Sequence, residues 1–515
     1  IRTIPMMPCS RFSDRLPGST PKIGLLLLSL FLPLLLSACG GDDDPGTVAT
    51  DTFASDANAA TDGASADGTS ETTDPTPGCD PIDPGHCLLP FPSNKFLAPN
   101  PKTPTGFQLA LRQSGMPANT EGVRVDPKAW NRMDGYGIGW AALALFPDVD
   151  VSTLPSELTP TGCLADDASI VLLEVDKQGK ATRVPYFAEL DDDIDVQDPS
   201  ERVLMVRPLV IPREATRYVI AFRGLKNSKG VAFPPSKAFA QLRDGSISEP
   251  WLLKRKATFD AVFETLKTAG VKRADLQLAW DWTTSSSKAL HGDMLHIRDT
   301  GLEILGAKGP EFTVKKVTAY PAKKEANIAL AVTGTFRVPN FVKPTPIDDE
   351  TGYRLVRDDA GLPKQDGWRD APFWLMIPRA ALQDQANGGA VQGLMQYGHG
   401  LLGTGSQLGA GHTRGFLQAD HRIGFAANWT GMSHDEIPAI SQMVFDFSDF
   451  AIIPEHLHQG MFEQLAIARG VRERMGELAQ AIDAKLTAAQ RKQVGLTGPL
   501  KITLNKARQH YTGDS

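Results

Sequence analysis

The stretch VQGLMQYGHGLLG, residues 391–403, places a short apolar run directly before a glycine-rich segment. A short apolar run bounded by glycines is typical of a buried β-strand. Gly398 and Gly400 then provide the backbone freedom that a tight loop around His399 needs. We expect a strand that leads into a loop with a chemical role.

The segments on either side alternate between strand and helix patterns. Residues 312–320, 328–339 and 373–378 are predicted strands before this stretch, and residues 423–429 form one after it. A helix follows, whose apolar face carries Met461, Leu465, Ala468, Val471, Met475 and Leu478. This order predicts an α/β domain over residues 309–515, with an antiparallel pair at its front.

Residues 79–249 have a different pattern, with short apolar strands separated by turns. The runs 169–175, 202–206 and 217–222 are predicted strands, and residues 226–230 have turn composition. The pattern favours a β-sandwich, and RPLVIPREATRYVIAFRGLKNSKG resembles Ig-like modules of bacterial surface proteins. Residues 250–308 are predicted to be a helical and mixed connecting segment.

The N-terminus has the pattern of an export signal. Arg11, Arg15 and Lys22 precede an apolar run at 23–36 that is too short to span a bilayer. The run ends in LSACG, which resembles a bacterial lipobox with Cys39 as the lipidated residue. An ordinary cleavage site beside an unrelated cysteine is the alternative.

From this signal, residues 1–38, we expect export and a lipid anchor in a bacterial membrane. Gly40 after the cysteine favours the outer membrane or cell surface if the host is Gram-negative. Residues 39–78 are predicted to be a disordered acidic tether, because they carry nine acids and few large apolar residues.

Charge excludes one class of partner. Residues 1–38 contribute +3 and the tether −9 to the net charge of −7, so residues 79–515 carry about −1. A nucleic-acid-binding protein needs a concentrated basic patch, so no nucleic acid is predicted as a partner.

The cysteines suggest one disulfide. Cys79 and Cys87 bracket a short Pro/Gly loop, and such a pair is expected to be oxidised outside the cytoplasm. A metal site with His86 is the alternative, but no second His/Cys cluster accompanies it. We therefore predict no metal and no cofactor, with Cys163 left as a single thiol.

The last residues of the chain are Gly513-Asp514-Ser515. They match the first half of the G-x-S-x-G turn that exposes a nucleophilic serine between a strand and a helix. The same tripeptide pattern occurs at Ser70 and at Ser433, the latter with Asp435 where the second glycine should stand. Since the chain begins without Met and stops within this motif, we expect it to be a fragment.

The segment QYGHGLLG resembles the HG oxyanion motif of lipases and esterases. The resemblance implies that the backbone N–H of Gly400 or Leu401 stabilises an oxyanion and that His399 orients the loop. A glycine-rich turn without chemistry is the alternative.

Over residues 79–515 the chain resembles bacterial extracellular lipoprotein lipases and esterases that carry an N-terminal β-rich domain. The matching segments are CLLPFPSN at 87–94, AWDWTT at 279–284, YGHGL at 397–401, NWTGM at 428–432 and GDS at 513–515. The resemblance implies an α/β-hydrolase fold and hydrolysis of carboxylic esters or lipids by a Ser-His-Asp triad. Ser515 is the implied nucleophile, and the acid and histidine are expected beyond it, so this fragment is expected to be inactive.

Two other functions remain open. A non-catalytic surface lipoprotein, either an adhesin or a glycan-binding module, fits the tether and the β-rich part equally well. A peptidase or a polyester depolymerase on the same fold is the enzymatic rival. Polar residues that could rim the pocket are His412, Asp420, His421, His434 and Asp435.

The lipobox leads to a direct test. Replacing Cys39→Ala removes the thiol that takes the lipid, so we expect the protein to move from the membrane fraction to the soluble fraction. Fractionation followed by immunoblotting measures this. Retention in the membrane would contradict the lipobox.

Overall fold

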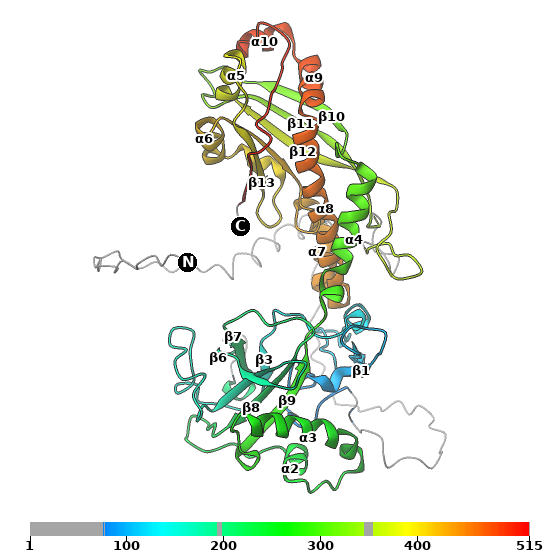
Figure 1. The fold of residues 1–515 in the computed structure, drawn as a ribbon, viewed down its shortest axis with the longest axis vertical. Coiled ribbons are helices and arrows are strands. Elements are labelled where there is room, and N and C mark those ends of the chain that lie inside the picture. Colours follow the sequence, from blue (N-terminus) through cyan, green and yellow to red (C-terminus); the bar gives the residue numbers. More distant parts are fainter. Residues whose placement is uncertain (1–75, 77, 193–197, 344–353, 514–515) are drawn as a thin grey trace, which may run out of the picture. The chain divides into compact units, whose positions relative to one another are not determined.

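The computed structural model describes residue 76 and residues 78–192, 198–343 and 354–513. They form a mixed α/β protein with several separate sheets (Figure 1). The chain divides into residues 1–68 and 69–515, and every described residue belongs to the second unit. Cys39 and Ser515 lie outside the described residues, as does the predicted signal segment.

The first part of the described chain is mostly β-structure. Its elements are β1 (Leu97–Pro99), β2 (Phe107–Leu109), β3 (Ala142–Ala144), β4 (Ile170–Val175), β5 (Ala181–Arg183), β6 (Tyr186–Leu190), β7 (Leu204–Pro208), β8 (Arg217–Arg223), α2 (Lys237–Asp244), α3 (Leu253–Thr268) and β9 (Leu276–Thr283). The strands form three antiparallel sheets with the orders β1-β2, β3-β7-β6 and β5-β4-β8-β9.

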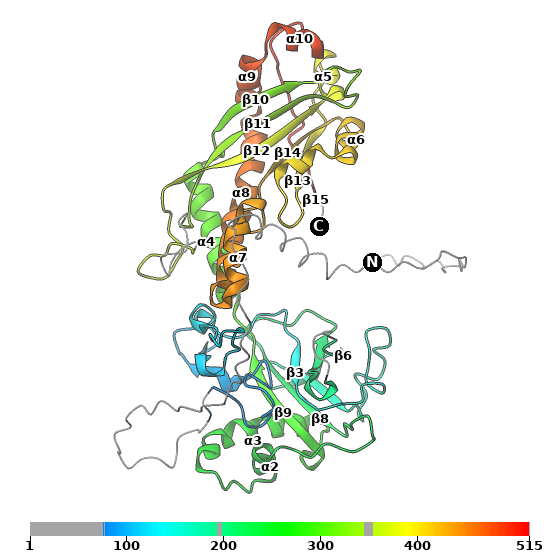
Figure 2. The same cartoon turned by 180° about the vertical axis from the view of Figure 1, so that it is seen from behind.

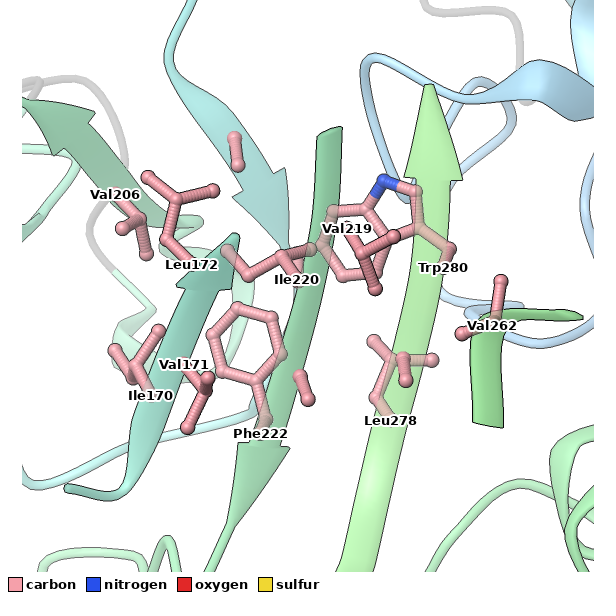
Figure 3. Close-up of a cluster of buried hydrophobic side chains, with 14 of the residues drawn as sticks. Ile170, Val171, Leu172, Val206, Val219, Ile220, Phe222, Val262, Leu278 and Trp280 are labelled. Carbon is pink, nitrogen blue, oxygen red and sulfur yellow. The ribbon is translucent and has the colours of Figure 1, made fainter. Parts of the chain in front are cut away.

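The four-stranded sheet is buried on both of its faces. Along β8, the buried side chains of Tyr218, Ile220 and Phe222 point to one face, because side chains alternate along a strand. On that face Tyr218 packs with Trp140, and Phe222 packs with Phe146. Arg217 points to the other face, where it contacts Asp281 and Thr265 of α3. Figure 3 shows residues of β4, β7, β8 and β9 together in this core.

The helices α2 and α3 form a layer that the predicted β-sandwich does not include. Both α2 and α3 contact β9, and α3 also contacts β8. The strand β9 falls in the predicted connecting segment 250–308, but it pairs with β8 along its length. Its run LQLAWDWT is buried at every position, which explains why it has no alternating pattern in the sequence.

The loop between Cys79 and Cys87 is closed by a disulfide, with the two Cα atoms 4.4 Å apart. Within the loop, the buried carboxylate of Asp80 accepts a hydrogen bond of 2.8 Å from Arg255 of α3. The loop is thus attached to the helical layer. Cys163 is a free, buried thiol.

The second part of the described chain alternates strands and helices. Its elements are α4 (Ser287–Leu305), β10 (Phe312–Ala319), β11 (Ile328–Pro339), β12 (Trp368–Pro378), α5 (Arg379–Ala386), β13 (Gly393–Gly398), α6 (Gly411–Ala419), β14 (Arg422–Ala427), α7 (Ile437–Phe445), α8 (Ile452–Glu473), α9 (Met475–Lys485), α10 (Ala488–Val494) and β15 (Gln509–Gly513). The predicted antiparallel pair at the front is confirmed as β10 and β11.

One six-stranded mixed sheet organises this part, in the order β10-β11-β12-β14-β13-β15. The first four strands in that order pair antiparallel. β13 pairs in parallel with β14 on one side and with β15 on the other. Figure 2 shows β13, β14 and β15 beside one another.

The two faces of this sheet carry separate cores. Leu394 and Phe425 face the larger core, which includes Phe462 and Ile467 of α8. Tyr397 and Ala426 face the smaller core, which includes Leu417 of α6. The helices α6 and α8 therefore cover opposite faces.

The opposite placement follows from the handedness of crossover connections. A connection between parallel strands of one sheet is almost always right-handed. From β13 to β14 the chain moves one way across the sheet through α6, and from β14 to β15 it moves back the other way through α7 to α10. Reversing the direction reverses the face on which the helices pack.

A close backbone approach fixes α8 against the loop after β14. A Cβ atom on Gly460 of α8 would clash with the carbonyl oxygen of Thr430 and lie 3.0 Å from its nitrogen. Gly431 next to it has a φ of +94°, and a Cβ there would lie 2.6 Å from the backbone nitrogen of Leu457. Glycine is needed on both sides of this contact, since backbone cannot move aside as a side chain can.

We expect Gly460→Ala to lower the free energy of unfolding by about 1–2 kcal/mol, because the overlap with backbone outweighs the better helix propensity of alanine. Gly476→Ala in α9 is the matched control, since a Cβ there meets no atom within 4 Å. It should leave stability unchanged or raise it by up to about 1 kcal/mol. Thermal melting of both variants measures the difference; equal melting temperatures would contradict the close contact.

Candidate functional site

The carboxyl end of β13 lies level with the ends of both of its neighbours. Gly398 is opposite Gly513 of β15, and Tyr397 is opposite Ala426 of β14. Because the three strands are parallel, their carboxyl ends lie at the same edge of the sheet. The loop that begins at His399 therefore lies beside Gly513 and beside the segment that begins after Ala427.

β13 is also the point at which the strand order reverses. The chain continues from β13 to β14 on one side and returns to β15 on the other. In open α/β sheets, ligands bind in the crevice outside the carboxyl ends of the strands at such a point. The fold alone thus marks the loop after β13 as a candidate site.

His399 is buried and hydrogen-bonded at both ring nitrogens. Its Nε2 accepts the backbone N–H of Trp429 at 2.8 Å, so the proton is on Nδ1, which donates to the Gly400 carbonyl oxygen at 2.7 Å. Burial lowers the pKa of His399, outweighing the hydrogen bond to Gly400 and the nearby Asp435 carboxylate. A neutral histidine with both nitrogens occupied can hold the loop but cannot take a proton from a nucleophile.

The backbone N–H groups of this loop differ in what they can bind. Gly400 N–H donates to Gln407 Oε1 at 3.1 Å and Leu402 N–H to the Met432 carbonyl at 2.8 Å. Gly403 N–H donates to the Gly400 carbonyl at 2.9 Å. Leu401 N–H has no acceptor among the described residues. Of the two predicted oxyanion donors, Leu401 is thus the one whose N–H is available.

The backbone conformation and the exposure of Leu401 agree with an N–H that is unpaired among the described residues. Leu402 has a φ of +56°, in the left-handed region, which turns the chain sharply after Leu401. Leu401 as a whole residue is 71% exposed. The turn is therefore open to a ligand at this position.

The loop after β14 holds the first loop from the other side. Asn428 accepts the N–H of Gly405 at 2.9 Å through Oδ1 and donates to Asp435 Oδ2 at 2.8 Å through Nδ2. His434 N–H donates to the Gly403 carbonyl at 2.9 Å. One asparagine side chain thus links both loops.

Buried polar residues anchor the second loop to α8. Thr430 Oγ1 donates to Glu463 at 2.8 Å, and His456 Nδ1 lies 2.6 Å from Glu436 Oε2. Burial alone would raise the pKa of Glu436, but hydrogen bonds from His456 and from the Gly431 N–H lower it. The carboxylate therefore stays ionised and keeps the turn fixed on the helix.

Gly398, the last residue of β13, has no room for a side chain. A Cβ there would overlap the hydroxyl of Tyr511 and lie 3.2 Å from Trp429 Nε1. Tyr511 is on β15 and is itself 58% exposed. The glycine thus lets an aromatic side chain from each neighbouring segment close over the strand end.

The structure brings some of the predicted residues together and separates others. His399, Gly400 and Leu401 share one turn, and Asp435 reaches it through Asn428. Asp420 and His421 precede the first residue of β14 and so lie at the opposite, amino edge of the sheet. Ser515 follows β15 by two residues, outside the described part of the chain.

Sequence reasoning missed Gln407, and it missed the pair of Glu436 and His456. Gln407 lies in the short 3-10 helix η7 (Gly405–Gly409), four residues after the motif, and glutamine there has no pattern of its own. Glu436 and His456 are 20 residues apart and meet only because α8 folds back on the loop. No local signal could have identified either.

Nothing in the described residues indicates a metal centre, since no group of three or more His, Cys, Asp or Glu side chains is placed to hold an ion. No described helix has both the length and the apolarity needed to cross a bilayer.

Comparison with known proteins produced no match, whether to a family, to a curated protein or to a solved structure. What the site can do must therefore be argued from its geometry.

The buried histidine leads to a pH-dependent prediction. A histidine whose pKa is lowered by folding binds its proton more tightly in the unfolded chain, so stability falls as the pH drops below about 6.5. At pH 8, His399→Asn should cost about 2 kcal/mol through two lost hydrogen bonds, and this cost should shrink by pH 5. Urea unfolding at both pH values measures it.

The exposed His510 of β15 provides the control. His510→Asn should change stability little, because its exposed side chain is not buried by folding. A cost of His399→Asn that stays constant between pH 8 and pH 5 would contradict the assignment of a neutral, buried His399.

Proposed function

We propose that this chain carries the front part of an α/β-hydrolase domain and belongs to an exported, lipid-anchored serine hydrolase that cleaves carboxylic esters or lipids. Ser515 is the nucleophile in this proposal, Leu401 N–H is an oxyanion donor, and His399 orients the loop. The triad acid and histidine follow Ser515 in chain order. No cofactor takes part.

One observation carries the proposal: the parallel register that sets Gly398 opposite Gly513. Both segments implicated by their motifs, the loop from His399 and the Asp514-Ser515 pair, begin where these two strands end. In the α/β-hydrolase arrangement the serine follows a strand directly, and one oxyanion donor comes from the loop between a neighbouring strand and its helix. Here that loop connects β13 to α6.

The strand order supports the same fold. An antiparallel front, made of β10, β11 and β12, leads into three parallel strands with β13 between β14 and β15. This is the arrangement that the resemblance to α/β-hydrolases implies. Helices on both faces of the parallel strands agree with it.

The hydrogen bonds of the loop support the role of each residue. An oxyanion donor must have a free N–H that is held before the substrate arrives, because preorganisation is what makes it effective. Within the described part of the chain, Leu401 has a free N–H. His399 helps to hold the loop in place before the substrate arrives, because it binds Trp429 N–H and the Gly400 carbonyl. Gly400, whose N–H is engaged by Gln407, is the weaker candidate.

We also propose that two of the three antiparallel sheets in the N-terminal part, β3-β7-β6 and β5-β4-β8-β9, form an Ig-like β-sandwich. They share one core, as the sheets of a sandwich do. The layer of α2 and α3 is an addition to that arrangement.

The test is turnover of short p-nitrophenyl esters by the complete gene product. Ser515→Ala removes the nucleophile, so we expect kcat to fall by at least about a thousandfold. Ser70→Ala is the matched control, because Ser70 follows the same G-x-S pattern outside the domain, and it should retain full activity.

Unchanged turnover in Ser515→Ala would contradict the proposed nucleophile. A correctly folded complete protein with no turnover of any ester would favour the non-catalytic surface lipoprotein. Turnover of peptides or polyesters but not of small esters would favour the rival enzymes on the same fold.

A further inference from the structure

We propose that Gln407 is a positioning residue for the oxyanion loop: its side-chain oxygen binds Gly400 N–H and so leaves Leu401 N–H as the donor directed to the substrate. The inference rests on the proposed hydrolase function. It adds a residue that no motif identifies and that, among the described residues, makes no hydrogen bond with His399.

The hydrogen bond sets the orientation of the amide. A backbone N–H can only donate, so the side-chain atom 3.1 Å from the Gly400 nitrogen must be Oε1. Gln407 itself is anchored at its own backbone, where its N–H donates to the Thr404 carbonyl at 3.1 Å. The acceptor is thus presented to the loop from a fixed point on η7.

Gly403 makes this contact possible. A Cβ atom on Gly403 would lie 2.8 Å from Gln407 Oε1 and 2.9 Å from both Gln407 Nε2 and the Gly400 carbonyl oxygen. The amide therefore occupies the space that a side chain would take. Gly403 does not have a positive φ, so its role here is to leave room.

Without Gln407, two adjacent N–H groups would be unpaired in the same turn. Gly400 N–H and Leu401 N–H could then both turn toward solvent or substrate, and neither would be fixed as the single donor. The Gly400 carbonyl already accepts from His399 Nδ1 and from Gly403 N–H. Gln407 completes the pairing of Gly400, so that among the N–H groups of Gly400, Leu401, Leu402 and Gly403 only that of Leu401 has no acceptor in the described part of the chain.

Three substitutions separate this role from others. Gln407→Met keeps the length of the side chain and loses the acceptor, whereas Gln407→Glu keeps an acceptor at the same place. Gly403→Ala displaces the amide without changing its chemistry and should behave like Gln407→Met. Gln178→Met, on an exposed turn of the N-terminal part, controls for adding an apolar side chain to the surface.

The first readout does not depend on activity. Hydrogen–deuterium exchange of peptides covering residues 396–408 reports the Gly400 hydrogen bond directly. In Gln407→Met and Gly403→Ala the Gly400 amide should exchange about tenfold faster, and in Gln407→Glu at the wild-type rate. Unchanged exchange in Gln407→Met would overturn the proposal.

The second readout is steady-state ester hydrolysis by the complete gene product. Gln407→Met and Gly403→Ala should lower kcat about tenfold with little change in KM, because an oxyanion donor acts in the transition state. Gln407→Glu should stay within about threefold of wild type. A loss in Gln407→Glu as large as that in Gln407→Met would overturn the positioning role and would indicate that the amide Nε2 contacts the substrate.

The two proposals can fail separately. If Ser515→Ala retains turnover, the proposed function fails, while the exchange experiment still decides whether Gln407 holds Gly400. If Ser515→Ala is inactive and the Gln407 variants match wild type in both readouts, the function stands and the role of Gln407 is refuted.

Discussion

The arrangement of the second part of the chain depends on one constraint, the parallel pairing of β13 with a strand on each side. Parallel strands require crossovers, and crossovers are right-handed, so α6 and α8 must pack on opposite faces. The same pairing aligns three strand ends at one edge. The glycine-rich loop lies at that edge, at the point where the strand order reverses.

The loop itself is held by side chains rather than by secondary structure. A glycine-rich segment has many conformations available, and each must be excluded before a backbone N–H can act as a preorganised donor. Here His399, Gln407 and Asn428 each bind backbone groups of the turn or of its partner loop. Buried polar groups are normally paired, and in this turn the pairing leaves the N–H of Leu401 available.

The second loop owes its position to a contact between backbones. Gly431 and Gly460 lack the Cβ atoms that would separate the turn after β14 from α8. Once they approach, Thr430 and Glu436 reach the buried Glu463 and His456 of the helix. Stability and the candidate site are thus coupled, because α8 supports the loop on which Asn428 and Trp429 lie.

Apolar periodicity, a local property, was sufficient to predict the strand before the glycine loop and the antiparallel pair at the front of the sheet. It predicted one helix with an apolar face from Met461 to Leu478, but the structure divides this segment into α8 and α9 and leaves Met461 and Leu465 exposed. The sequence also indicated His399, Gly400 and Leu401. Three features appear only in the folded chain: β9 joins the four-stranded sheet, Gly398 lies opposite Gly513, and Gln407 binds Gly400 N–H. Strand order, register and side-chain partners depend on packing between distant segments, which no local pattern encodes.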